Sequence, residues 1–295
     1  MMTERKKIKN LALCGGGFYG YAELGALKEL EKYKEYFDIQ TIKGVSVGSI
    51  VAVLYAIGYT IDELIKILFE TDFDNLIKDK YFPRIHLYSN YGMHDANELE
   101  NEIERLISVK TNIRLCTFSQ IRKDLTIIAT NLNYQCPKFF NKENTPNVAI
   151  SKAVRCSISF PFIMTPVLFE GDLYIDGGAY INYPITTFKD QELDETIGIT
   201  FSTYNENLDR SLKEKYPIND VYDYFISLGQ TMTRSAYLAQ ITDRHFQRSL
   251  VIKISENISS MQFRLTEEQK KYIYQCGIDA VKNQISKILD IEKLE

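Results

Sequence analysis

Apolar residues recur along the chain with two periods, one typical of buried strands and one typical of helices. Short apolar runs bounded by glycine or polar residues predict strands. Apolar residues at helical spacing, as at Tyr21, Leu24 and Leu27, predict amphipathic helices. Capping boxes are predicted at 60–63 and 95–98, where Thr or Asp precedes Glu by three positions. The predicted strands are 8–14, 37–44, 124–132, 173–178, 195–202 and 249–255, and the predicted helices are 18–35, 47–58, 148–157, 217–244 and 266–289.

Strands and helices alternate along most of the chain, which predicts an α/β fold. Such an order is typical of a mostly parallel central sheet with helices on both faces. A polar stretch at 204–216 predicts a loop, but we find no repeat and no linker rich in Pro, Gly or Ser. We therefore expect one domain over residues 1–295.

Composition and charge restrict the kinds of partner. The chain has 295 residues, of which 45% are hydrophobic and 25% charged, as in ordinary globular proteins. The formal net charge of −4 gives no reason to expect nucleic acid or a strongly anionic membrane as partner. The short basic run at 5–9 is interpreted as a solvated tail, with a membrane-steering patch as the alternative.

The cysteines and the apolar runs predict a cytoplasmic protein, either free or attached to the surface of a membrane. The five cysteines are an odd number without C-x-x-C spacing, so we expect reduced core residues. The first apolar run is too short for a signal peptide, and the longest run, 49–58, is too short to span a bilayer.

The glycine-rich stretch CGGGFYG follows the first predicted strand. Gly15, Gly17 and Gly20 match G-x-G-x-x-G, which is typical of dinucleotide sites. Such sites have an acidic residue about 20 positions later, at the end of the second strand. Here the second strand ends in KGVS, which disfavours a dinucleotide. The alternative is a loop whose backbone N–H groups face another negative charge.

A second motif, GVSVG, lies where the second strand meets the apolar helix. Gly44 and Gly48 would relieve crowding in a sharp turn, so that Ser46 can hold a strained backbone and project its hydroxyl. The alternative is a plain strand-to-helix turn with a chance serine. If the first two strands are neighbours, the glycine loop lies beside Ser46. The N–H groups of Gly15, Gly16 and Gly17 could then hold an oxyanion formed at Ser46.

A serine nucleophile requires a base, and Asp176 in LYIDGG is the best candidate. It follows a predicted strand, so we expect it at the same edge of the sheet as Ser46. Gly177 and Gly178 would keep its loop tight, and partial burial would raise its pKa. DGG is also typical of an ordinary turn. The histidines His86, His94 and His245 lie outside glycine-flanked strand ends.

Together these motifs resemble the patatin-like phospholipases. CGGGFYG, GVSVG and DGG occur in that family's order, and the resemblance covers about residues 8–200, with 201–295 as the mainly helical C-terminal part of the same domain. It implies a phospholipase A-type lipid acyl hydrolase with Ser46 as nucleophile, Asp176 as proton acceptor and the Gly15–Gly17 amides as oxyanion hole. It implies an acyl-serine intermediate, no metal and no cofactor, and a lipid substrate met at a membrane or micelle surface.

The chain departs from the family pattern at two positions in the glycine loop. Cys14 stands where many members have an acidic residue, and Tyr19 stands where many have Arg or Lys. We expect activity to survive, because neither change removes a backbone donor.

Several alternatives remain open at the level of sequence. One is an α/β-hydrolase triad of Ser46, Asp176 and His245, which follows that fold's chain order. Others are a non-catalytic lipid-binding protein of the same fold and an acyltransferase that uses the same dyad. The segment 81–93 is a candidate lip or an ordinary surface loop. The candidate acyl pocket, with core packing as its alternative, comprises Phe160, Phe162, Ile163 and Met164.

Overall fold

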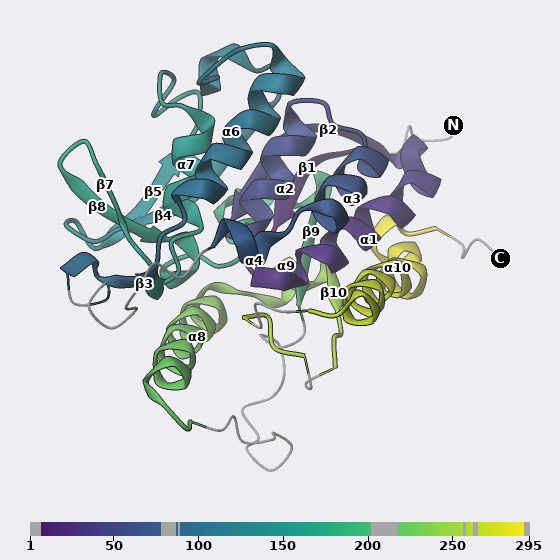
Figure 1. The fold of residues 1–295 in the computed structure, drawn as a ribbon. Helices are drawn as coiled ribbons and strands as arrows, with labels where there is room; N and C mark the ends of the chain where they lie inside the picture. The colour runs from purple at the N-terminus through teal and green to yellow at the C-terminus, as the bar shows by residue number, and fades with distance from the viewer. Residues whose placement is uncertain are drawn as a thin grey trace.

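A mixed β-sheet with helices packed around it forms the centre of this α/β fold (Figure 1). The computed structural model describes residues 7–77, 87, 89–201, 218–255, 258–261 and 265–291. The predicted loop at 204–216 and residues 81–86 and 88 of the candidate lip lie outside these ranges. The strands are β1 Ile8–Leu13, β2 Phe37–Val45, β3 Gly92–His94, β4 Asp124–Asn131, β5 Cys136–Phe140, β6 Phe162–Met164, β7 Val167–Phe169, β8 Asp172–Asp176, β9 Thr196–Phe201 and β10 Ser249–Ile252.

Five strands of this sheet run parallel, in the order β10–β9–β1–β2–β4. The central strand β9 is buried along its whole length, whereas β2 alternates between buried and exposed residues over most of its length. The first two strands are neighbours, with Leu13 opposite Gly44, so the glycine loop after β1 and the turn after β2 emerge together. The prediction of a mostly parallel core is thereby confirmed.

The other strands join the sheet through β4, which changes partner halfway along one side. There β2 pairs with Asp124–Ile128, and the antiparallel β8 pairs with Ala129–Asn131. The opposite side of β4 is occupied by β5 over Ile127–Asn131. The ends of β2 and β8 therefore meet against two consecutive residues of one strand. β7 continues from β8, and β3 pairs with β6 in a separate two-stranded sheet.

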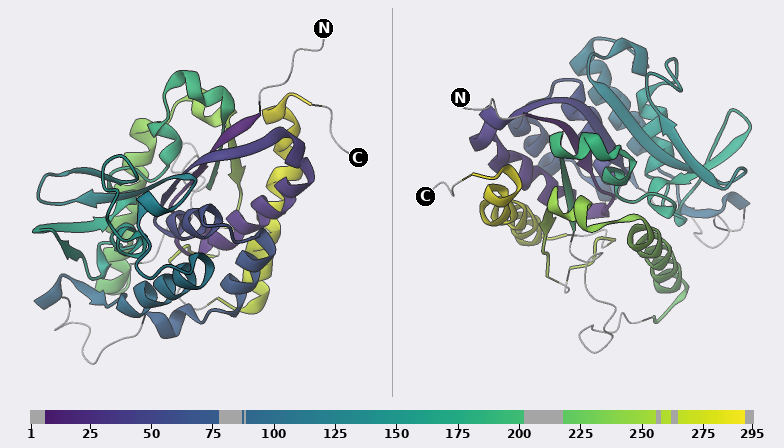
Figure 2. Two further views of the ribbon diagram at one scale, coloured as in Figure 1. Left: turned by 90° about the horizontal axis from the view of Figure 1, so that it is seen from above. Right: turned by 180° about the vertical axis from the view of Figure 1, so that it is seen from behind.

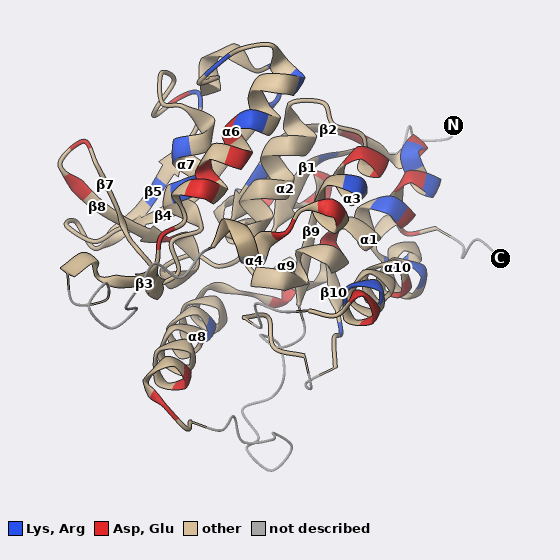
Figure 3. Ribbon diagram, viewed as in Figure 1, with Lys and Arg blue, Asp and Glu red and all other residues tan. Residues whose placement is uncertain are grey.

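Helices cover the two faces of the sheet unequally (Figure 2). The uncharged α2 packs on β1, β2 and β4, between the charged surfaces of α3 and α6 (Figure 3). The other face is covered at β1 and β9 by short 3₁₀-helices, η5 (Pro184–Thr187) and η6 (Asp190–Glu195). The α-helices are α1 Gly20–Leu30, α2 Val47–Ala56, α3 Ile61–Glu70, α4 Phe73–Leu76, α6 Asn97–Thr111, α7 Ile150–Ser157, α8 Val221–Gln240, α9 Asp243–Gln247 and α10 Glu267–Leu289.

Several helix boundaries differ from the predictions. The helix predicted at 18–35 is α-helical only to Leu30 and continues as a 3₁₀-helix to Tyr36. The capping box predicted at 95–98 is wrong, because α6 begins at Asn97 with Ala96 as its N-cap residue. The capping box at 60–63 and the Thr266 cap are both confirmed. The helix predicted up to residue 244 is divided into α8 and α9.

The structure also describes part of the N-terminal basic run, the five cysteines and the helices that were compared with the thickness of a bilayer. Ile8 and Lys9 of the basic run belong to β1, and Lys9 pairs with Glu195 at 3.1 Å, so this part is not a tail. All five cysteines have free thiols. Within the described residues, no helix is both long and apolar enough to cross a lipid bilayer.

A buried acid lies in the core behind the glycine loop. Glu23 of α1 is 0% exposed, and neither carboxyl oxygen has a hydrogen-bond partner among the described residues. Burial raises its pKa well above the ordinary value, so the protonated form is favoured in the folded chain. The unfolded chain ionises at lower pH, and Glu23 therefore costs stability as pH rises.

We predict that Glu23→Gln stabilises the protein at neutral and higher pH. The two proteins should differ least in stability at about pH 3, where Glu23 is protonated in both states. Above that, the variant should gain up to about 1.4 kcal/mol per pH unit until the folded carboxyl ionises. Urea unfolding at a series of pH values measures this gain. A difference in stability that does not change with pH would contradict the buried, unpartnered acid.

Candidate active site

Ser46 lies in a strained turn between β2 and α2. Its backbone has φ +52° and ψ −129°, a conformation that side-chain-bearing residues rarely adopt. Space forces glycine on both sides of it. A Cβ at Gly48 would lie 2.7 Å from the carbonyl oxygens of Leu13 and Cys14, and one at Gly44 would lie 2.5 Å from the Gly48 carbonyl. This is the geometry expected for a G-x-S-x-G turn.

Two serines hold the backbone of Ser46 in this conformation. The Ser46 N–H donates to the hydroxyl of Ser157 at 2.9 Å, and that hydroxyl donates to the carbonyl of Ile128 at 2.6 Å. On the other side, the Ser49 hydroxyl donates to the Ser46 carbonyl at 2.5 Å. Ser157 thus bridges the gap on β4 where pairing with β2 ends. Sequence reasoning missed this residue, because a serine at the end of a helix carries no signal of a distant partner.

Asp176 is the last residue of β8 and lies opposite Ala129 of β4. It is 2% exposed, and its N–H donates to the Ser159 carbonyl at 2.9 Å. Its carboxylate accepts the N–H of Gly178 at 2.7 Å. Burial raises the pKa of Asp176 to about 6, although hydrogen bonds from the Ser46 side chain and the Gly178 N–H lower it in part.

The reason that Asp176 reaches Ser46 differs from the one expected. We expected its strand to end at the carboxyl edge together with parallel neighbours. Instead β8 is antiparallel, and it pairs with only three residues of β4 before it ends. Its last residue therefore stops beside the end of β2, since Val45 lies opposite Ile128 and Asp176 opposite Ala129.

The glycine loop offers fewer backbone donors than the sequence suggested. The N–H of Gly15 donates to the Asn182 carbonyl at 2.9 Å, so it is already used within the protein. Gly16 and Gly17 show no partner for their N–H groups among the described residues, and Gly17 has φ +53°. All three glycines line the same pocket as Ser46 and Asp176.

Asn182 fixes the glycine loop from the segment that follows Asp176. Its side-chain N–H₂ donates to the Gly15 carbonyl at 3.2 Å and to the Cys14 sulfur at 3.4 Å, and the residue is 3% exposed. A side chain added at Gly178 would collide with the Asn182 Oδ1, at 2.6 Å. This side chain therefore ties the glycine loop to the Asp176 loop. The sequence analysis did not identify Asn182.

The pocket beside Ser46 is mainly apolar. Two of the four residues predicted to form an acyl pocket lie in its wall. Phe160 and Met164 line the pocket. Phe162 instead stacks on Phe225 with ring centroids 4.5 Å apart, and Ile163 is buried in a separate cluster, so these two residues do not line this pocket and fit the alternative of core packing. Among the described lining residues, Asp176 is the only charged one. The other apolar lining residues are Phe18, Tyr21, Val47, Ile50, Leu68, Phe73, Ile77, Leu99, Ile158 and Met261.

His245 lies away from this pocket. It precedes β10, which is parallel to β9 and β1, so it lies near the amino edge of the sheet, whereas Ser46 lies at the carboxyl edge. Its Nδ1 accepts the N–H of Thr242 at 3.1 Å as part of the α9 capping box. The geometry therefore does not support the Ser46–Asp176–His245 triad. His94 lies in β3 and does not line the pocket, and His86 lies outside the described residues.

The sequence profile of the patatin-like phospholipases matches residues 11–189, which include the glycine loop, the Ser46 turn and Asp176. This chain belongs to the patatin-like phospholipase family.

Curated relatives and a solved structure resemble this chain to different degrees. The patatin-like chain is 59% identical to the uncharacterized protein R571 of Acanthamoeba polyphaga mimivirus, over 96% of each chain. It is 30% identical to the probable lipid hydrolase 463L of Invertebrate iridescent virus 6, over 69% of this chain and 74% of that protein. The crystal structure of VipD from Legionella pneumophila has the same fold, with a TM-score of 0.59 at 15% identity over 96% of this chain and 67% of VipD.

The two departures from the patatin-like pattern are both buried. The Cys14 thiol is 0% exposed, and burial raises its pKa well above the ordinary value, so it is not a reactive thiolate. Tyr19 is 4% exposed, donates its hydroxyl to the Ile258 carbonyl at 2.7 Å and packs edge-on against Phe201. Neither side chain lines the pocket.

We predict that Ser157→Ala loosens the Ser46 turn of this patatin-like protein. The change leaves the partly buried Ser46 N–H and the carbonyl of the buried Ile128 without their partner, which should cost about 1–3 kcal/mol of unfolding free energy. Hydrogen exchange of the peptide that contains Ser46 should also become faster.

Ser151→Ala is the matched control, because Ser151 lies on the same helix and is also buried. Its hydroxyl donates to Glu104 at 2.8 Å and has no connection to the turn. This variant should lose stability without faster exchange at Ser46. Equal exchange at Ser46 in both variants would contradict the bridging role of Ser157.

Proposed function

We propose that this chain hydrolyses acyl ester bonds of lipids in the manner of a phospholipase A, with Ser46 as nucleophile and Asp176 as proton acceptor. The observation that carries the proposal is the buried Asp176 carboxyl, which lines the same apolar pocket as Ser46 and whose pKa burial raises to about 6. A base with a pKa just below neutral is ionised at physiological pH and still accepts a proton effectively. Membership of the patatin-like family supports the same activity.

The proposed first half-reaction forms an acyl-serine. Asp176 accepts the hydroxyl proton of Ser46 while the Ser46 oxygen attacks the ester carbonyl. The negative oxygen of the tetrahedral intermediate would accept hydrogen bonds from the N–H groups of Gly16 and Gly17. The intermediate then collapses, the ester C–O bond breaks, and the leaving alcohol takes the proton from Asp176.

The second half-reaction releases the fatty acid. Asp176 now accepts a proton from a water molecule, which attacks the acyl carbonyl through a second tetrahedral intermediate. The bond between the acyl carbon and the Ser46 oxygen breaks, and Ser46 recovers its proton from Asp176. An alcohol in place of this water would give acyl transfer, so the acceptor decides between hydrolase and acyltransferase. The cycle uses no metal or cofactor.

The apolar pocket favours a lipid acyl chain as the part of the substrate that it holds. Its lining is mostly aliphatic and aromatic, and these side chains gain free energy by covering alkyl groups. We propose that the ester is presented from a membrane or micelle surface. A lipid-binding protein without activity is the alternative, and ester turnover by the wild type but not by Ser46→Ala distinguishes the two.

We predict that ester hydrolysis requires ionised Asp176. The kcat/KM of the wild type should fall about tenfold per pH unit below pH 6, because the carboxyl is then protonated and cannot act as a base. Asp176→Asn should lower kcat by about 10²–10⁴-fold. Stopped-flow or steady-state assays with a chromogenic short-chain ester measure both. A wild-type profile that stays flat from pH 4 to pH 8 would count against this assignment.

The same substitution should stabilise the folded chain at neutral pH. The folded pKa of Asp176, about 6, lies above its ordinary value of 3.8, so the wild type loses stability as pH rises between these values. Asp176→Asn avoids this loss and should be more stable at pH 8 by about 1–3 kcal/mol. At pH 3.5 the two proteins should unfold at similar urea concentrations. Loss of stability at pH 8 would mean that the carboxylate is a structural group.

His245→Ala tests the rival triad. We expect near-normal turnover, because His245 caps α9 at the other edge of the sheet. A loss as large as that of Ser46→Ala would restore the triad and remove Asp176 as the direct base.

A further inference from the structure

A second apolar cavity adjoins the pocket that contains Ser46. The two cavities share four lining side chains: Ile50 of α2, Leu68 of α3, Phe73 of α4 and Leu99 of α6. We call the second one the distal cavity. The same four residues line both cavities. Only their side chains therefore separate the distal cavity from the pocket of Ser46.

The distal cavity has the composition of an alkyl-binding site. It lies among α1, α2, α3 and α6, and it is lined by buried aliphatic residues such as Leu24, Leu64, Ile103 and Leu106. Its polar lining residues are Thr71 and Glu102, and Glu102 is paired with Arg105 on the surface of α6. A ligand group that enters this space therefore finds hydrocarbon walls.

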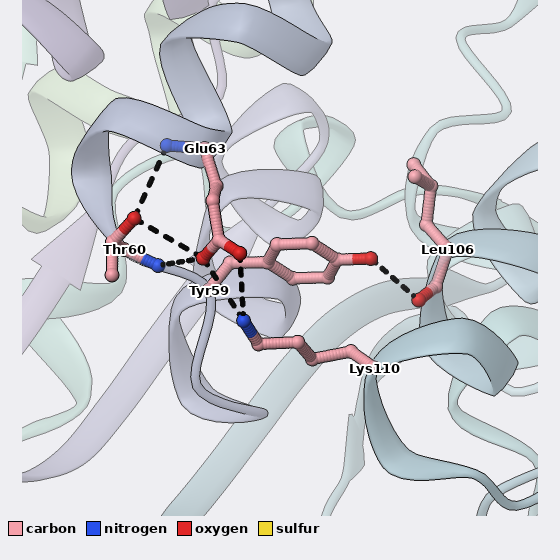
Figure 4. Close-up of polar contacts among 5 residues, drawn as sticks. All are labelled: Tyr59, Thr60, Glu63, Leu106 and Lys110. Carbon is pink, nitrogen blue, oxygen red and sulfur yellow. Dashed lines mark hydrogen bonds and ion pairs between the residues drawn. The ribbon is translucent and has the colours of Figure 1, made fainter.

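Hydrogen bonds and an ion pair hold the helices around the distal cavity apart at a fixed spacing (Figure 4). The Tyr59 hydroxyl donates to the Leu106 carbonyl at 2.9 Å, and Lys110 contacts both carboxylate oxygens of Glu63, at 3.0 Å and 2.9 Å. Glu63 also closes the capping box with Thr60 at the start of α3. These contacts fasten the end of α6 to the turn between α2 and α3, which disfavours closure of the cavity by movement of the helices.

We infer that the distal cavity receives the terminal carbons of the substrate's acyl chain and thereby sets the preferred chain length. The acyl chain is the occupant because it begins at the carbonyl attacked by Ser46, and the cavity continues the pocket away from that point. Side chains at Ile50, Leu68, Phe73 and Leu99 would have to rotate aside for the longer chains. This inference takes its ligand from the proposed function.

The test is a series of p-nitrophenyl esters, from butanoate to palmitate, assayed with Ile103→Phe. Ile103 lines the distal cavity but not the pocket of Ser46, and a phenyl group in its place should fill the distal cavity. We expect kcat/KM for short esters to stay close to that of the wild type and kcat/KM for long esters to fall about tenfold or more, since each excluded methylene weakens binding severalfold. Leu64→Ala, which enlarges the cavity, should shift the optimum toward longer chains.

Ile107→Phe is the matched control. Ile107 lies one turn along α6 and is 0% exposed, but it lines neither cavity. The control should show no dependence of its effect on chain length. Thermal unfolding of all three variants shows whether each is folded. An equal loss at every chain length in Ile103→Phe, or the same selective loss in Ile107→Phe, would overturn the inference.

Calorimetry of fatty-acid binding separates this inference from the proposed catalysis. Ser46→Ala protein should bind saturated fatty acids with an affinity that rises with length up to a limit, and adding Ile103→Phe should move that limit to shorter chains. An unchanged limit refutes the distal site even if the wild type hydrolyses esters. A shifted limit without any ester hydrolysis by the wild type supports the site and refutes the catalytic proposal.

Discussion

The candidate site depends on a change of partner along one side of β4. Pairing with β2 ends at Ile128, and pairing with the antiparallel β8 begins at Ala129. The two strand ends therefore face one another, with Ser46 following one and Asp176 closing the other. The hydroxyl of Ser157 occupies the gap, where it accepts the Ser46 N–H and donates to the Ile128 carbonyl. An unbroken ladder of parallel strands would leave no room for this meeting.

This arrangement places unfavourable elements together, and the surrounding structure compensates for them. A serine with positive φ, a buried carboxylate and two backbone N–H groups that have no partner in the part of the chain that the structure describes each cost free energy in isolation. They persist because the sheet on one side and α2 and α7 on the other hold them in place. Asn182 adds a second connection, between the glycine loop and the segment after Asp176. Strain of this kind is typical of functional sites, where it fixes reacting groups before the substrate arrives.

Sequence reasoning located the parts of the site that depend on neighbouring residues. The glycines on either side of Ser46 follow from local crowding in the turn, as predicted. The position of the glycine loop beside this turn follows from the parallel pairing of β1 with β2, which was also predicted. Residues with distant partners were not. The Gly15 N–H is used by Asn182, Ser157 reaches Ser46 across 111 positions, and no local pattern announces either contact. Phe162 has φ +66° and stacks on Phe225 of α8 instead of lining the pocket, and no local pattern indicates this contact. Asp176 lines the same pocket as Ser46, as expected, but the strand that carries it is antiparallel and not parallel.

The central claim is that Ser46 and Asp176 form one reactive pair. Mass spectrometry of protein treated with a fluorophosphonate measures this most directly, because the reagent labels only an activated serine hydroxyl. We expect a single adduct on the peptide that contains Ser46, with a labelling rate that rises with pH around pH 6 and is lost in Asp176→Asn. An adduct on another residue, or equal labelling of Ser46 in Asp176→Asn, would contradict the account.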